Sequence, residues 1–300
     1  MIASRTTART ILALALALFV TLVVRTAAAG PKATPQVIVF PVLAPTVYTD
    51  DFGDPRPGGT HKGIDILAPK RALALAAEGG KIKFWKTSAA AGCMLYLYGA
   101  SGTTYDYIHL NNDLTKRNDN RGKCVAGTAY AKGLKNGAKV TAGQVVGYVG
   151  DSGDANGLHP HLHFELHPNR GGAVDPYPWL QRAQHLLFAA PRGMPFMLKL
   201  CGTVTAVSVD ALRLKASTVS AWPMAQHQSK LARALLVLVP DSAIVQTVRK
   251  FGAPGSLVDL TSARPGEAVE LWTSTAPTTL KAERGDDLAL SASLVSLVGQ

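Results

Sequence analysis

The stretch from Gly157 to Leu166 alternates apolar and polar side chains, and this alternation predicts a β-strand with one buried face. The apolar face carries Leu162, Phe164 and Leu166, and the polar face carries His161, His163 and Glu165. Two imidazoles on one strand face can hold a metal ion together, or one can bind the metal while the other transfers protons. The pattern therefore predicts a sheet that carries a candidate site on its polar face.

Short apolar runs separated by Gly, Asn and Asp fill residues 73–148, which is the pattern of antiparallel strands and hairpins. Residues 94–98 and 103–110 are predicted as neighbouring strands within this region. Residues 137–150 carry a Gly every few positions and are predicted as a tight hairpin. The fold class that these runs indicate is mainly β, with antiparallel pairing.

His109 is a third candidate site residue, near the end of the strand predicted over 103–110. Strict alternation along that strand puts His109 on the same face as Tyr105 and Tyr107. Directly after it, residues 111–136 form a polar insertion rich in Asn, Asp, Lys, Arg and Gly. Because the insertion leads away from His109, we expect it to lie beside the site.

Residues 191–195 read as a linker, so the chain is divided into a first domain over 30–190 and a second over 191–300. A hydrophobic fraction of 47% is enough to fill both cores. A short helix over 178–187 is expected to close the first domain. The second is predicted as a small β-barrel or sandwich, with strands over 197–209, 211–216, 234–239, 268–273 and 288–298 and a helical turn beginning near 229–236.

Residues 1–29 have the layout of a secretory signal peptide: two arginines, an apolar run and a small-residue site at Ala27 to Ala29. The alternative is an uncleaved membrane anchor. Cleavage removes three arginines and lowers the formal net charge from +11 to +8. A basic exported protein suits an anionic polymer such as the bacterial cell wall, or an acidic membrane surface. Nucleic acid fits less well with export, and no aromatic and basic binding motif supports it.

Three cysteines in an exported chain permit one disulfide. Cys93 and Cys124 both fall in the first domain, and their pairing would join the polar insertion to the sheet. Cys201 lies in an apolar strand-like run and is expected to be a buried free thiol.

His61 and Asp65 are four residues apart, with Gly63 between them. Alone, such a pair is commonly a solvated turn. Together with one histidine of the pair His161 and His163, they give two imidazoles and a carboxylate, which suits Zn²⁺ and leaves one tetrahedral position open for water. An open position indicates a catalytic site, in which the remaining histidine and His109 can exchange protons near neutral pH. The spacing alone does not choose between His161 and His163 as the metal ligand.

Eight segments, in this order, resemble the M23 zinc metallopeptidases of the lysostaphin and LytM type. They are Phe40-Pro41, Phe52-Gly53, His61 to Asp65, Tyr107 to Leu110, Gly143 to Gly147, Gly150 to Gly153, His161 to Glu165 and Val174 to Pro176. The resemblance covers residues 37–182, about half the chain, and implies an antiparallel sheet with an open groove. It also implies cleavage of peptide cross-links in peptidoglycan.

Carried over residue by residue, the resemblance implies that His61, Asp65 and His163 bind one Zn²⁺ and that His109 and His161 are catalytic. Glu165 is then expected to be structural. The leading hypothesis is an exported zinc endopeptidase acting on peptidoglycan peptides, in the cell wall, the periplasm or outside the cell. The alternative is a catalytically inactive LytM-like protein that binds the wall or activates a hydrolase.

Two departures from the family pattern stand out. Residues 158–160 intervene between Gly157 and the histidine pair, and the insertion over 111–136 is longer than usual. His159, within the first departure, is expected to be a loop residue. The second can wall the groove and alter the choice of substrate.

Overall fold

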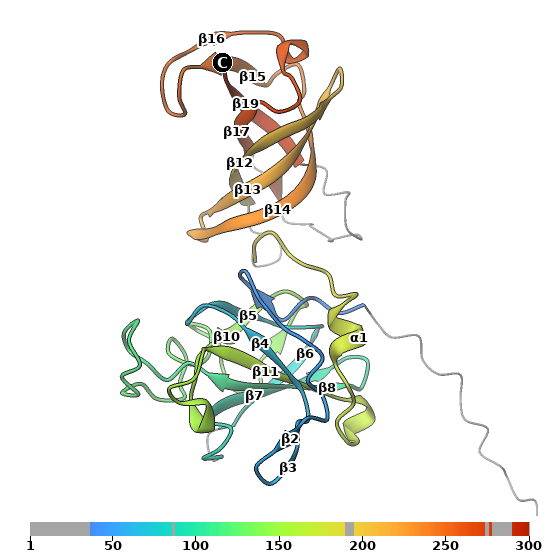
Figure 1. Ribbon diagram of the computed structural model, residues 1–300, viewed down its shortest axis with the longest axis vertical. Coiled ribbons are helices and arrows are strands. Elements are labelled where there is room, and N and C mark those ends of the chain that lie inside the picture. Colours follow the sequence, from blue (N-terminus) through green and yellow to red (C-terminus); the bar gives the residue numbers. More distant parts are fainter. Residues whose placement is uncertain (1–36, 86–87, 190–194, 274–275, 278–289, 300) are drawn as a thin grey trace, which may run out of the picture. The chain divides into compact units, whose positions relative to one another are not determined.

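The computed structural model describes residues 37–85, 88–189, 195–273, 276–277 and 290–299 (Figure 1). The proposed signal peptide over 1–29 and residues 191–194 of the proposed linker lie outside this set. Among the described residues, no helix is long and apolar enough to cross a membrane.

The first half of the chain is built around a six-stranded antiparallel sheet in the order β4-β11-β8-β7-β6-β9. Its strands are β4 (Ile64–Leu67), β6 (Gly80–Trp85), β7 (Cys93–Gly99), β8 (Thr104–Leu110), β9 (Lys139–Val140) and β11 (His161–His167). The predicted strands over 94–98, 103–110 and the histidine run are confirmed within a residue or two at their ends. The central position of β11 places the alternating histidine run beside both β4 and β8.

A second sheet packs against the first. It has three strands in the order β1-β5-β10, namely β1 (Val42–Leu43), β5 (Leu73–Leu75) and β10 (Val145–Tyr148). Apolar side chains of both sheets, including Val42, Val146, Leu95 and Phe164, form one buried cluster. The other face of the six-stranded sheet is therefore the face that carries the polar side chains of β11.

The segment over 137–150 is not the hairpin that its glycines predict. β9 pairs with β6 in the six-stranded sheet, whereas β10 pairs with β5 in the three-stranded sheet. The turn between β9 and β10 instead bonds to Ala76, directly after β5: Gly143 N donates to Ala76 O, and Ala76 N donates to Gln144 O. The glycine-rich segment thus connects a strand of one sheet to a strand of the other.

The smaller elements of this half include a two-stranded ribbon, β2 (Pro55–Arg56) with β3 (Gly59–Thr60), and the 3-10 turns η1 (Gly153–Ala155) and η2 (Pro168–Arg170). α1 (Tyr177–Leu180) is a single turn, much shorter than the helix predicted over 178–187. The chain leaves the helix because Gln184 pairs with the N-terminal segment: Gln184 N donates to Ile38 O, and Gln184 O accepts from Phe40 N.

The second half of the chain forms an eight-stranded sheet, coloured from yellow to red in Figure 1. Its strands are β12 (Pro195–Val207), β13 (Ala211–Trp222), β14 (Gln226–Leu238), β15 (Ile244–Val248), β16 (Gly255–Leu257), β17 (Ala268–Thr273), β18 (Ala276–Pro277) and β19 (Leu290–Val298), with one 3-10 turn, η3 (Leu260–Ser262). β14 pairs with β13 on one edge and, in parallel, with β19 on the other. The strands β14-β13-β12-β17-β19 therefore close into a ring around a buried apolar cluster.

Two expectations for this half were wrong. Residues 229–236 belong to β14 and form no helical turn, because Ser229 and residues 233–236 pair with β13 and Leu235 is buried in the apolar cluster. Cys201 is free, as expected, but it is only partly buried. Its side chain lies on the β12 surface, 3.8 Å from the carboxylate of Glu270.

Candidate metal and catalytic site

His61, Asp65 and His163 converge on the polar face of the six-stranded sheet. Asp65 on β4 stands directly opposite His163 on β11 in the strand register, and His61 precedes β4. His61 Nε2 lies 2.9 Å from His163 Nδ1 and 3.1 Å from Asp65 Oδ1, and His163 Nδ1 lies 2.9 Å from the same oxygen. Two nitrogens and one oxygen therefore meet at a single point.

The opposite ring nitrogens of the two histidines are held by hydrogen bonds. His61 Nδ1 donates to the backbone carbonyl of Asp51 at 2.8 Å, and His163 Nε2 donates to Glu165 Oε1 at 3.0 Å. These bonds fix the orientation of the two rings, so that His61 Nε2 and His163 Nδ1 face Asp65 Oδ1, as in metal-binding histidines. The donor set, two imidazoles and one carboxylate, fits Zn²⁺.

The carboxylate of Asp65 is ionised at neutral pH, as a metal ligand must be. Burial alone would raise the pKa of Asp65, but hydrogen bonds with His163 and His61 hold it well below its usual value. Burial likewise would lower the pKa of His163, but its bonds with Asp65 and Glu165 raise that pKa to about 9. Both shifts have one cause, because this site favours a positive charge beside Asp65.

His109 and His161 lie next to this group, with ring centroids 5.0 Å apart. His161 Nδ1 donates to the carbonyl of His159, and His161 Nε2 lies 3.7 Å from Asp65 Oδ1. His109 Nδ1 donates to the carbonyl of Ser152 at 2.8 Å. Burial, followed by the neighbouring His161, lowers the pKa of His109 to about 4, so its Nε2 is free to accept a proton at neutral pH.

His109 reaches this face through a β-bulge, which strict alternation did not predict. Leu95 pairs with Tyr107 and Cys93 with Leu110, so the single residue Met94 faces two residues of β8. His109 has a left-handed φ of 60° at this point. The bulge turns its side chain away from the core face of Tyr107 and sends Leu110 into the core in its place.

Gly63 is a site residue that motif matching alone did not single out. A Cβ there would lie 2.5 Å from the carbonyl oxygen of Phe164 and 2.9 Å from His163 Nε2. Only glycine leaves room for β11 to approach the turn between His61 and Asp65. His159, in the departure from the family pattern, is exposed and contributes its carbonyl to His161.

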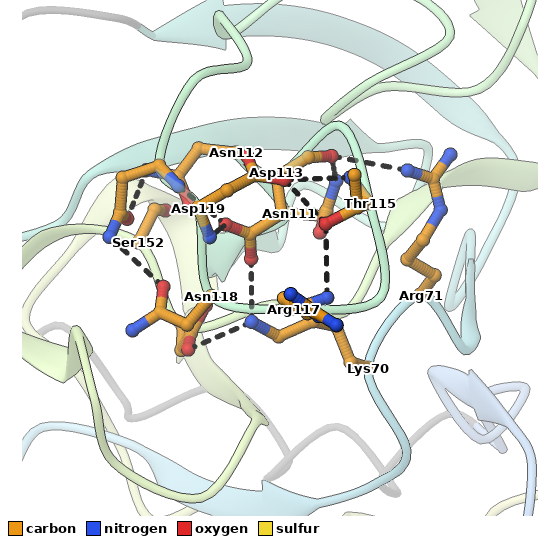
Figure 2. Close-up of polar contacts among 12 residues, drawn as sticks. Lys70, Arg71, Asn111, Asn112, Asp113, Thr115, Arg117, Asn118, Asp119 and Ser152 are labelled. Atoms are coloured by element: carbon orange, nitrogen blue, oxygen red, sulfur yellow. Dashed lines mark hydrogen bonds and ion pairs between the residues drawn. The ribbon is translucent and has the colours of Figure 1, made fainter.

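The insertion over 111–136 lies beside His109, as expected, and Figure 2 shows its Asp113 bonded to Lys70 and Arg71. Cys93 and Cys124 are joined by a disulfide, which confirms the predicted pairing. Lys70 Nζ binds Asp113 Oδ2 at 2.6 Å and Asp151 Oδ2 at 3.1 Å. These bonds fix the insertion to Asp151, the residue directly before Ser152, whose carbonyl orients His109.

An asparagine network makes a further connection. The side-chain amides of Asn118 and Asn120 donate to Asn156 Oδ1 at 2.8 and 2.9 Å. Asn156 follows Asp154, whose carboxylate lies 3.7 Å from His109 Nε2. The insertion and the loop after β10 are thus one polar unit at this edge of the site.

Residues 124–176 match the model of peptidase family M23. That segment contains His161 and His163, and the fold brings His61, Asp65 and His109 to them from outside it. The chain is 28% identical to the L-Ala–D-Glu endopeptidase of Bacillus subtilis over 153 residues, which is 47% of this chain and 42% of that protein. It is 30% identical to the DD-carboxypeptidase/endopeptidase Mpg of Neisseria meningitidis over 138 residues, 44% of this chain and 27% of that protein.

Among solved structures, the catalytic domain of the antimicrobial peptidase lysostaphin from Staphylococcus simulans is 26% identical. The match covers 45% of this chain and 92% of that domain, with a TM-score of 0.35. The chain spans less than half the length of the two curated relatives it matches.

Proposed function

Because this chain carries a domain of peptidase family M23, we propose that it is an exported zinc-dependent endopeptidase that cleaves peptide cross-links in bacterial peptidoglycan. One observation carries the proposal: three candidate metal ligands and two further histidines, drawn from three separate segments, meet on one sheet face with every histidine oriented by a hydrogen bond.

In this proposal His61, Asp65 and His163 hold one Zn²⁺. When bound, the ion would polarise an amide carbonyl and make a water molecule more acidic. His109 and His161 stand beside these three residues, and each presents Nε2, since their Nδ1 atoms donate to backbone carbonyls.

The proton chemistry belongs to the two histidines. His109 stays neutral at physiological pH, because burial lowers its pKa to about 4, and a neutral imidazole can accept a proton from the attacking water. His161, 3.7 Å from Asp65, is placed to donate to an oxyanion or a leaving amine.

Residues 1–29 support export as a cleaved signal peptide, and a net charge of +8 on the remaining chain suits an anionic wall polymer. The names of the relatives specify different peptide bonds, L-Ala–D-Glu in one and a DD bond in the other. The proposal therefore names the substrate class, peptidoglycan peptides, and leaves the bond to experiment.

The test is digestion of purified muropeptides of several cross-link types, with mass spectrometry of the products and a chelator-treated control. We expect cleavage of at least one type, its loss with chelator and its return with Zn²⁺. A protein that holds zinc but cleaves no muropeptide or purified sacculus would contradict the proposal and favour the inactive alternative.

A further inference from the structure

We propose that Asp106, Glu165 and His167 form a second site for a divalent transition metal such as Zn²⁺, beside the first site on the same sheet face. Each of the three offers one ligand atom, and these atoms all lie within 4.8 Å of one another. His167 Nε2 is 2.7 Å from Glu165 Oε2 and 3.8 Å from Asp106 Oδ2. This site goes beyond peptide hydrolysis and does not depend on it.

The sheet register places two carboxylates opposite each other on neighbouring strands. Glu165 on β11 is directly opposite Asp106 on β8, and the two residues are only 9% and 8% exposed. Like charges opposite each other on neighbouring strands are destabilising, and burial makes the repulsion stronger. A cation between the two carboxylates would remove the repulsion.

Asp106 supplies a second and independent observation. Its Oδ1 atom is buried and has no hydrogen-bond partner among the described residues. The great majority of buried polar atoms in proteins have a hydrogen-bond partner. A buried carboxylate oxygen without one is therefore a candidate ligand for a bound ion. The oxygen belongs to the residue that faces both Glu165 and His167.

His167 is prepared as a ligand in the same way as the histidines of the first site. Its Nδ1 donates to the carbonyl of Gly171 at 3.0 Å, which fixes the ring so that Nε2 faces Glu165 Oε2. The turn η2 returns the chain to make this bond, with left-handed φ values at Asn169 and Arg170. One imidazole and two carboxylates suit zinc and similar divalent ions.

Glu165 connects the two sites through different oxygens. Oε1 accepts from His163 Nε2 at 3.0 Å, and Oε2 faces His167. A metal ion held by Oε2 would fix the carboxylate that orients His163, a proposed ligand of the first ion. The second ion would therefore stabilise the geometry of the first site and take no direct part in hydrolysis.

The experiment measures metal stoichiometry on the full chain. The protein is stripped with chelator, reloaded with Zn²⁺ and freed of excess metal by gel filtration, and zinc per chain is measured by mass spectrometry. We expect two equivalents for the unaltered protein and one each for Asp106→Asn and His167→Gln. His61→Ala, which alters the first site, should also leave one, and His61→Ala combined with His167→Gln should leave none.

Matched controls are Asp210→Asn and His227→Gln, exposed residues of the second half, which should keep two equivalents. Asp106→Asn removes a charge opposite Glu165, so the metal-free variant should melt at the same temperature as the unaltered protein or higher, which reports its folding. One equivalent in the unaltered protein would overturn the proposal and indicate that a protonated His167 neutralises the carboxylates. Two equivalents retained by Asp106→Asn and His167→Gln would overturn it as well.

Discussion

His163 and His161 lie two residues apart on β11, yet their contacts indicate different roles, metal binding for His163 and proton transfer for His161. His163 meets His61 and Asp65 at 2.9 Å, whereas the Nε2 atom of His161 stays 3.7 Å from Asp65. His163→Ala should therefore lose both zinc and activity. His161→Ala should keep its zinc and lose about 100-fold to 10,000-fold in turnover, the usual size of an acid–base contribution.

Zinc content and muropeptide cleavage, measured on the same samples, check this prediction. His159→Ala is the matched control, because only its backbone carbonyl contacts the site, and it should retain zinc and most of the activity. If His161→Ala lost the metal and His163→Ala kept it, the two roles would be reversed.

Gly63 gives a second prediction at the scale of one residue. Gly63→Ala places a methyl group 2.5 Å from the carbonyl oxygen of Phe164, so β11 and the turn before β4 must separate. Such overpacking costs about 1–3 kcal/mol of unfolding free energy and should also weaken zinc binding. Gly172→Ala, with no atom within 4 Å of the added Cβ, is the control. Urea unfolding and zinc titration measure both effects; equal stability of the two variants would contradict the close approach.

At this scale the sequence could predict which residues form the site. The alternation at His161 and His163 and the spacing of four between His61 and Asp65 can both be read from nearby positions in the chain. It could not predict the backbone groups that orient the rings, such as the carbonyls of Asp51 and Ser152, because they come from distant loops. It also placed His109 on the wrong face. A bulge at one residue breaks the alternation on which such face assignments depend.

At the scale of elements, the anchoring of the insertion depends on Lys70. Its ammonium group lies between Asp113 and Asp151, whose side chains are almost fully buried. Lys70→Met would leave two buried carboxylates without their cation and should lower the unfolding free energy by about 3–5 kcal/mol. The exposed Lys123, in the same insertion, is the control, and Lys123→Met should change stability by less than about 0.5 kcal/mol. Denaturant unfolding measures both.

The same ion pairs predict how this effect depends on pH. Burial alone would lower the pKa of Lys70, but its hydrogen bonds to Asp113 and Asp151 raise it. A raised pKa in the folded state means that the stabilisation is complete below the unfolded pKa of about 10.4 and is lost only as pH rises through the folded pKa. The loss in Lys70→Met should therefore be constant from about pH 6 to pH 9. A loss that disappears within this range would contradict the assignment.

Elements with a clear local signal were predicted well, and those that depend on distant partners were not. β7, β8 and β11 follow from their own patterns. β9 and β10 read as a hairpin because glycines mark a turn but do not say which strands the flanking residues join. The run over 229–236 has helix-forming residues, and pairing with β13 overrides that preference.

At the scale of the whole molecule, the division at residues 191–195 is still a prediction from the sequence. The sheet topology is consistent with this division, because no sheet combines strands from before and after these residues. The ring β14-β13-β12-β17-β19 surrounds an apolar cluster that also takes in Leu187 and Phe188, and every hydrogen-bond partner named for the site lies between Asp51 and Gly171. The second half therefore contributes no side chain to the proposed chemistry among the described residues.

A chain of residues 30–190 should fold alone, hold the same number of zinc ions as the full chain, and cleave soluble muropeptides within about a factor of two of its rate. Soluble fragments are the right substrate, because any contribution of the second half to wall attachment would change cleavage of intact sacculi only. In calorimetry the full chain should show two unfolding transitions, of which only the one shared with the shortened chain shifts when chelator is added. A single transition, together with a shortened chain that neither folds nor binds zinc, would mean that the two halves form one cooperative unit.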